Sequence, residues 1–238
     1  MKIIFWNTYK NKDINNFLID LIIENECDIL VLAEYIGDEI NLINELYLKD
    51  YQMESYQGFA CKKIKIFYKS DIEVDFGNDN SDYLSIKVKR NNLYFSLFAV
   101  HFPSKLYVPD DNRQMIARNL KNDIDEQENA AIVGDFNSNP FEKTMVAASC
   151  LSALPTSAYK ERTVQGNKCK ILYNPMWTFF DDFDKFPGTY FCRKSNDIDY
   201  FWNIYDQILL TNSLSKKLVK GSIKIIKNIG DINLIKRK

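Results

Sequence analysis

The stretch "AAIVGDFNSNPFE", residues 130–142, places a carboxylate and a carboxamide directly beyond an apolar run. The apolar residues end at Gly134, Asp135 and Asn137 follow, and the chain then turns at Asn139-Pro140. The ordinary interpretation is a buried strand followed by a turn, because Asp and Asn side chains bond to the backbone of turns. Taken alone, this interpretation is the stronger one, since short motifs match by accident. The other polar residues of the chain must therefore decide between a turn and a functional site.

Length and composition indicate one folded globular domain over residues 1–238. A chain of 238 residues can bury one sizeable core, and no repeat, low-complexity block or linker divides it. Hydrophobic residues make up 46%, which excludes a disordered chain. Lys and Arg number 31 against 32 Asp and Glu, so the surface is not uniformly basic, although a local basic groove remains compatible with these numbers.

The cysteines and the N-terminus predict a cytoplasmic protein without a membrane span. The five cysteines form no CxxC pair, and the chain has one histidine, which argues against a Cys/His zinc site and favours buried, reduced thiols. The first residues, "MKIIFWNTYKNKD", contain an apolar stretch too short for a signal peptide or a membrane span.

The apolar pattern predicts a layered α+β (α/β) sandwich. Residues 2–6 and 29–33 are apolar runs separated by a helical pattern that Asp13 is expected to cap, and such a crossover makes the two strands parallel. A further helix is expected at 110–127, directly before the strand 130–133, and another at 213–219. The remaining predicted strands are 64–68, 71–76, 82–89, 92–100, 169–173, 188–193, 203–210 and a last one near 221–227.

Polar residues that can take part in catalysis or bind a ligand stand at the ends of the predicted strands. Each of four apolar runs delivers such residues at its C-terminal end, and one residue precedes its run, where a strand of opposite direction would bring it to the same edge. Ligands usually bind at this edge of a sheet. The residues concerned are Asn7, Glu34, His101, Asp135 and Asn137 after their runs, and Asp206 before its run.

Each of these residues also has an ordinary structural explanation. Asn7 can end a strand, Glu34 can be a solvated carboxylate, and Asp206 can cap a turn. A lone histidine such as His101 is more often a hydrogen-bonded structural residue than a catalytic one. The shared placement of all of them is what favours a functional site.

The same stretches resemble the endonuclease/exonuclease/phosphatase superfamily of metal-dependent phosphoesterases. The matching segments follow one another in the family's order from residue 2 to about 211, and "GDFN" in this context is fairly specific. They are "FWN" at 5–7, "LAE" at 32–34, "VHF" at 100–102, "GDFNSNPF" at 134–141 and "YDQILLT" at 205–211. In addition, "YNPMW" at 173–177 and "GTYF" at 188–191 resemble a bacterial branch of the superfamily.

The resemblance implies a fold and a metal-dependent hydrolase. The fold is a four-layer α-β-β-α sandwich with two packed mixed sheets. The cofactor implied is Mg²⁺, with Mn²⁺ as a possible substitute, and its ligands would be the Glu34 carboxylate and the Asn7 carboxamide. A hard divalent cation of this kind prefers oxygen ligands and keeps open positions for water and phosphate.

The resemblance also implies roles for the other strand-end residues. Asp135 would orient or deprotonate the attacking water, and Asn137 would donate to a phosphoryl oxygen. His101 would contact the phosphate and assist the leaving group as an acid, and it is the one side chain here with an unperturbed pKa near neutrality. Asp206 matches an aspartate that holds a second histidine, and Thr189 would contact phosphate.

The chain departs from the family at its end. The family closes with a strand introduced by Ser-Asp-His, whereas this chain has no second histidine, and Ile and Asn follow Asp231 where His would stand. We therefore expect a C-terminally truncated domain or a partner chain that completes the site. Either case predicts impaired catalysis and an open sheet edge.

Three functions remain open at this level. The first is an Mg²⁺-dependent phosphodiesterase acting on nucleic acid, DNA or RNA. The second is a phosphatase or phospholipase-type phosphoesterase acting on inositol phosphates or sphingomyelin, which the near-zero net charge does not separate from the first. The third is a catalytically impaired binding module that uses the open edge to bind a partner.

Overall fold

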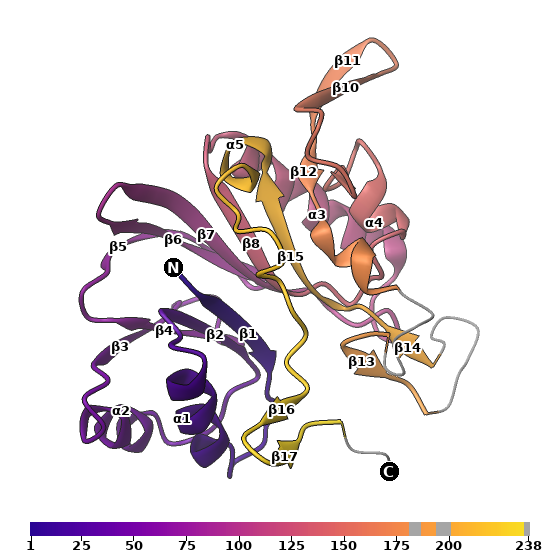
Figure 1. Cartoon of the computed structure of the whole chain (residues 1–238). Coiled ribbons are helices and arrows are strands. Elements are labelled where there is room, and N and C mark those ends of the chain that lie inside the picture. The colour runs from indigo at the N-terminus through magenta and orange to yellow at the C-terminus, as the bar shows by residue number, and fades with distance from the viewer. Residues whose placement is uncertain (181–186, 194–200, 236–238) are drawn as a thin grey trace.

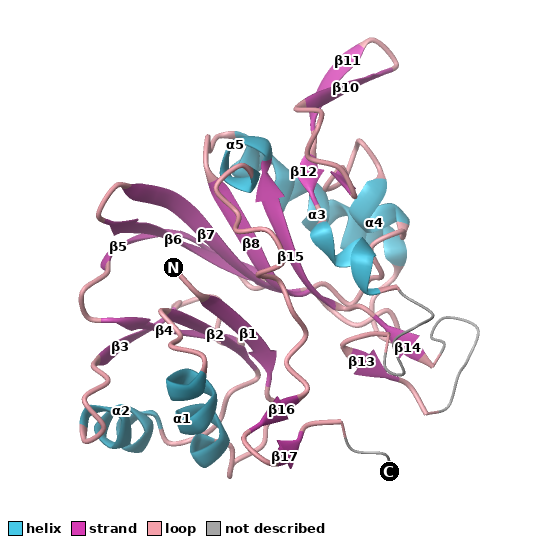
Figure 2. Cartoon of the chain, viewed as in Figure 1, coloured by secondary structure: helices cyan, strands magenta, loops and turns pink. Residues whose placement is uncertain are grey.

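The computed structural model describes residues 1–180, 187–193 and 201–235. Two β-sheets pack face to face, with helices on the outer faces (Figure 1). The helices α1 and α2 cover one sheet, and α3 and α4 cover the other (Figure 2). This is the α-β-β-α sandwich of two mixed sheets that the resemblance predicted.

The first sheet has the strand order β1-β2-β4-β3. Its elements are β1 (Ile3–Asn7), α1 (Asn15–Glu24), β2 (Ile29–Ala33), α2 (Glu39–Tyr47), β3 (Met53–Gln57) and β4 (Ile64–Lys69). β1 and β2 are parallel, as predicted from the crossover pattern, and β4 runs antiparallel to β2. β1 lies at the edge of this sheet and is half-buried along its length.

The second sheet has the order β5-β6-β7-β8-β15-β12-β9. Its strands are β5 (Glu73–Asp79), β6 (Tyr83–Arg90), β7 (Leu93–His101), β8 (Ala130–Asp135), β9 (Ala153–Leu154), β12 (Leu172–Tyr173) and β15 (Asp206–Thr211). The helix α3 (Asp110–Asp125) connects β7 to its parallel neighbour β8, and α4 (Lys143–Val146) follows β8. β15 runs antiparallel to β8, which is the direction that brings Asp206 to the end of β8.

Smaller elements lie outside the two sheets. They are the hairpin β10 (Glu161–Val164) and β11 (Asn167–Lys170), the 3-10 helix η1 (Pro175–Phe179), the pair β13 (Tyr190–Phe191) and β14 (Trp202–Asn203), the helix α5 (Asn212–Ser215), and the pair β16 (Asn228–Ile229) and β17 (Ile232–Asn233).

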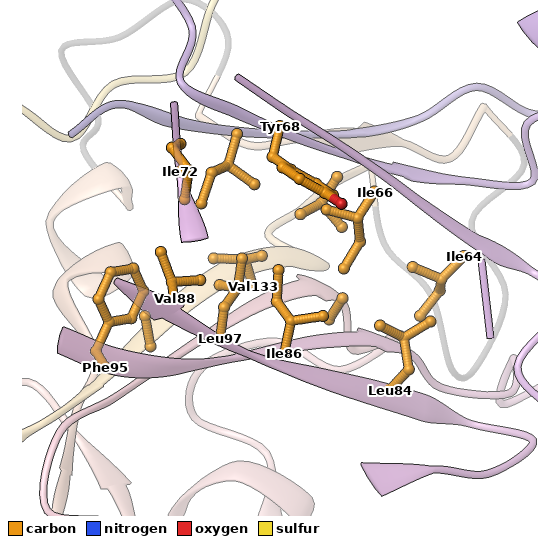
Figure 3. Close-up of a cluster of buried hydrophobic side chains, with 14 of the residues drawn as sticks. Ile64, Ile66, Tyr68, Ile72, Leu84, Ile86, Val88, Phe95, Leu97 and Val133 are labelled. Carbon is orange, nitrogen blue, oxygen red and sulfur yellow. The ribbon is translucent and has the colours of Figure 1, made fainter. Parts of the chain in front are cut away.

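The core between the sheets is mostly aliphatic. Ile66 of β4 faces Ile86 and Leu97 of the second sheet, and Val133 of β8 completes the layer (Figure 3). These side chains are at most 1% exposed. Each such side chain contributes about 1.5–3 kcal/mol when buried, so the core fixes how the two sheets face one another and where their strand ends lie.

Several sequence predictions about local structure were wrong. Asp13 does not cap α1: the N-cap is Ile14, and no side chain caps this end. The predicted helix 213–219 is limited to Asn212–Ser215, and the predicted strand 221–227 is absent, because those residues have no strand partner in the described chain and pairing begins only at Asn228. The strands predicted at 169–173 and 188–193 are broken or shortened.

In the described part of the chain, no helix combines the length and the apolar character that crossing a bilayer requires.

Candidate active site

Three of the predicted site residues stand side by side at one end of the second sheet. His101 ends β7, Asp135 ends β8, and the two residues are paired in the parallel register. Asp206 begins the antiparallel strand β15 and is paired with Asp135 on the other side. The register alone therefore aligns an imidazole and two carboxyl groups across three neighbouring strands.

The first sheet contributes two more residues at the same edge. Asn7 ends β1, and its Nδ2 donates to Oδ2 of Asp135 over 3.1 Å. Glu34 directly follows β2, and its Oε1 lies 3.3 Å from Nε2 of His101. These two contacts join the sheets at their strand ends. We call Asn7, Glu34, His101, Asp135 and Asp206 the strand-end cluster.

Glu34 is held in an unfavourable backbone conformation. Its φ is 52°, in the left-handed region, which costs a residue with a side chain about 1–2 kcal/mol. The backbone on both sides fixes it there: its N–H donates to the carbonyl of Lys63 over 2.8 Å, and its carbonyl accepts from the N–H of Lys10 over 3.2 Å. Such strain is common where a side chain must be aimed at a ligand.

Asn137 serves the turn and remains a candidate phosphate donor. Its backbone N–H donates to Oδ1 of Asp135 over 2.8 Å, and its Nδ2 donates to the carbonyl of Phe102 over 2.8 Å. An amide nitrogen has two hydrogens, so a second donation is chemically open. The stretch "GDFN" can therefore be both an ordinary turn and part of the candidate site, because the turn positions Asp135.

Thr189 lies beside Asp206. Its Oγ1 accepts from the backbone N–H groups of Tyr205 (3.1 Å) and Asp206 (3.0 Å), and its hydroxyl bonds to the Asp206 carboxyl group. Thr189 therefore helps to position Asp206, and the phosphate contact that the resemblance implied for it stays a prediction.

Burial perturbs the titration of the acidic residues. It raises the pKa of Asp206 well above its usual value, and the nearby Asp135 raises it further. Burial likewise raises the pKa of Asp135, against the opposing effect of His101.

The pKa of His101 is lowered by burial, while Asp135 and Glu34 act in the opposite direction. The buried Nδ1 of His101 has no hydrogen-bond partner among the described residues, so Nε2 is the nitrogen that faces the carboxylates.

Arg113 supports the site and was missed from the sequence. Its side chain on α3 is fully buried, and Nη2 donates to the carbonyls of Phe136 (3.2 Å) and Asn137 (2.6 Å) and to the hydroxyl of Ser138. The signal was available, because Arg113 shares a helical face with the buried residues Ala117, Leu120 and Ile124. An arginine on that face predicts acceptors inside the protein.

The chemistry of the cluster fits a hard divalent cation. Among the described residues, no three His, Cys, Asp or Glu side chains form a ready ligand set. The candidate ligands, Glu34 and Asn7, are instead one carboxylate and one amide, and Mg²⁺ commonly takes only one or two protein carboxylates and keeps several waters. Within the described chain, no Lys or Arg nitrogen lies within 4.0 Å of the carboxylates of Glu34, Asp135 or Asp206, so their charge has no ammonium or guanidinium partner.

Comparison with known proteins identifies the fold. No family model matches the chain, and no curated protein matches it in sequence. Among solved structures, D. rerio TDP2 complexed with a single-strand DNA product is similar with a TM-score of 0.57 and 17% identity, covering 88% of this chain and 82% of that one. An endonuclease/exonuclease/phosphatase family protein from Bacteroides thetaiotaomicron gives a TM-score of 0.50 and 13% identity, covering 83% and 72%. This chain has the endonuclease/exonuclease/phosphatase fold.

A third solved structure is also similar to this chain in its fold. The human Nocturnin catalytic domain with bound sulfate has a TM-score of 0.51 and 14% identity, covering 88% of this chain and 82% of that one. At these identities the likeness is one of fold alone.

Proposed function

We propose that this chain is a divalent-metal-dependent phosphodiesterase, using Mg²⁺ or Mn²⁺, and that nucleic acid is its substrate. One observation carries the proposal: Asn7, Glu34, His101, Asp135 and Asp206 converge from four strand ends and the start of β15 on one edge of two packed sheets. One neighbour of the same fold, D. rerio TDP2, is complexed with a single-strand DNA product, which supports this choice of substrate.

Glu34 and Asn7 would hold the cation. The strained backbone of Glu34 fixes its carboxylate at the cluster, and Asn7 offers an amide oxygen that already accepts one bond, from the N–H of Tyr9 over 3.0 Å. When bound, the cation supplies electrostatic stabilisation of the negative charge that develops on phosphoryl and leaving oxygens.

Asp135 is the proposed base that orients and deprotonates the attacking water. Its two oxygens are fixed, one by the Asn7 amide and the other by the backbone N–H of Asn137. Its raised pKa makes the carboxylate a better proton acceptor than an ordinary aspartate. Asp206, on the neighbouring strand, lies close enough to Asp135 for the Asp135 charge to raise the pKa of Asp206.

His101 and Asn137 would act on the phosphate. His101 presents Nε2 toward the cluster and would donate a hydrogen to a phosphate oxygen or to the leaving oxygen. Asn137 would use the second hydrogen of its amide. Phosphoryl transfer depends mainly on such positioning and charge stabilisation, which this arrangement supplies.

A substrate panel tests the proposal. The purified chain would be incubated with single-stranded and duplex DNA, RNA, inositol polyphosphates and sphingomyelin, each with Mg²⁺, with Mn²⁺ and with EDTA. The expected result is metal-dependent release of acid-soluble nucleotides, lost in Asp135→Asn, with no activity on the other substrates. Turnover of inositol phosphates or sphingomyelin without nucleotide release would overturn the choice of substrate. No turnover in any arm would favour a binding module.

A further inference from the structure

Two exposed aromatic rings stand on the loops that fix Glu34. Tyr9 follows β1 and Phe59 precedes β4, and their side chains are 86% and 93% exposed. The loop of Tyr9 reaches Glu34 through the Lys10 N–H, and the loop of Phe59 reaches it through the Lys63 carbonyl. The two rings therefore belong to loops on either side of the candidate metal ligand.

Hydrogen bonds and turns with left-handed residues define the backbone of both loops. The backbone N–H groups of Ala60 and Cys61 donate to the Asp79 carboxylate over 2.9 and 2.8 Å, and Cys61 itself is fully buried. Tyr9 and Lys10 both have left-handed φ values, 49° and 53°, although neither is Gly or Asn. Backbone strain of this kind is characteristic of ligand-contacting turns.

The same loops carry lysines. Lys10, Lys62 and Lys63 are exposed, and within the described chain none has a carboxylate within 4.0 Å. The positive charge of Lys63 helps to lower the pKa of His101, so Lys63 lies close to the strand-end cluster. A chain with a net charge of −1 thus has a local group of unpaired cations beside its candidate site.

We propose that Tyr9 and Phe59 are stacking platforms for the bases of a single-stranded nucleic acid, with Lys10, Lys62 and Lys63 contacting its phosphates; this inference rests on the proposed function. Each loop pairs an aromatic ring with lysine, and a single strand likewise alternates bases with phosphates. A ring can stack only on a base whose face is free, which a duplex hides. The surface therefore selects single strands over duplexes.

Binding of labelled oligonucleotides in EDTA, followed by fluorescence anisotropy, separates this inference from catalysis. The probes would be a single-stranded DNA 12-mer, its fully abasic counterpart of equal charge and the corresponding duplex. Tyr9→Ala and Phe59→Ala should each weaken binding of the single strand about 5- to 150-fold, the range for loss of one stacked base. Phe59→Trp should preserve it, and the abasic and duplex probes should bind weakly to every variant.

Tyr94→Ala is the matched control, because Tyr94 is also an exposed tyrosine (51%) but lies near the start of β7, at the end opposite His101. Thermal melts of each variant would verify folding. Equal affinity of wild type, Tyr9→Ala and Phe59→Ala for the single strand would overturn the inference even if the panel above shows nuclease activity. Ring-dependent binding without hydrolysis would leave the inference standing and remove the proposed function. If the rings were needed for binding to phosphatidylserine vesicles and no oligonucleotide bound, the inference would be overturned in favour of a membrane-binding surface.

Discussion

At the scale of single residues, His101 is the side chain whose role is most open to test. It is buried, burial lowers its pKa, and its Nε2 lies 3.3 Å from Oε1 of Glu34. We expect His101→Gln to lower kcat by roughly two to four orders of magnitude, the usual range for a positioned acid or base. KM should change far less, since the effect is confined to the transition state. Steady-state kinetics on an oligonucleotide substrate would measure both. Near-normal kcat with a small loss of stability would instead identify a structural histidine.

Glu34 provides a test of metal binding that needs no turnover. With Mg²⁺ at a hundredfold excess over its Kd, binding stabilises the folded state by about 2.7 kcal/mol, or roughly 5–11 °C in Tm for a chain of this size. We expect thermal-shift measurements to show such a rise in the wild type and none in Glu34→Ala. Glu128→Ala is the control, since that exposed residue lies just before the opposite end of β8. An equal rise in Glu34→Ala would remove Glu34 from the metal site.

The Asp206 side chain should destabilise the folded protein at neutral pH. Because its pKa is raised above the ordinary 3.8, the folded protein holds this proton more tightly than the unfolded chain. The stability that this proton contributes is complete below pH 3.8 and is lost as the pH rises through the raised pKa. In the absence of metal, Asp206→Asn should therefore raise Tm at pH 7 and have little effect at pH 3.5, as calorimetry at both values can test. The exposed turn residue Asp231→Asn is the control. A lower Tm at pH 7 for Asp206→Asn would contradict the pKa direction.

At the scale of elements, Gly134 sets how closely β7 and β8 approach, and thereby the alignment of His101 with Asp135. Its φ is +151°, and an added Cβ would lie 2.0 Å from the backbone oxygen of Val100 on the neighbouring strand. Backbone in a central strand cannot yield locally, so we expect Gly134→Ala to destabilise by about 3 kcal/mol or more, measurable by urea denaturation. Gly221→Asn, in open space and in a conformation that Asn tolerates, should stay within about 0.5 kcal/mol. Equal stability of the two variants would refute the packing argument.

At the scale of the whole molecule, the sequence predicted the layers and the residues of the strand-end cluster because strand periodicity determines which residues lie at strand ends. Asn7, Glu34, His101, Asp135 and Asp206 could be found in this way. The position of Thr189 could not, since it depends on a loop returning to the first residue of β15. Pairing also decides whether an apolar pattern becomes a strand: residues 221–227 have the pattern, but the described chain forms no β-ladder there.

A second prediction at this scale concerns the second histidine that the resemblance implies. The sequence has one histidine, and within the described chain the Asp206 carboxyl group has Thr189 as its bonded partner and no imidazole. β1, at the edge of the first sheet, has β2 as its strand partner in the described chain, and its other side is where we expect an added strand to pair. We therefore expect a fragment that carries a Ser-Asp-His strand to raise turnover of the metal-loaded chain. The same fragment with Ala in place of His should bind with similar affinity and leave turnover unchanged.

The comparison requires that both fragments bind, which calorimetry establishes before the kinetic assay. Strand addition supplies main-chain hydrogen bonds whatever the side chain at the histidine position, so affinity should be similar for the two fragments. A positioned acid or base contributes roughly two to four orders of magnitude, so even a geometry well short of ideal should give a measurable gain in kcat. Equal turnover with the His and Ala fragments, both bound, would show that the chain does not use a second histidine and that Asp206 acts without one.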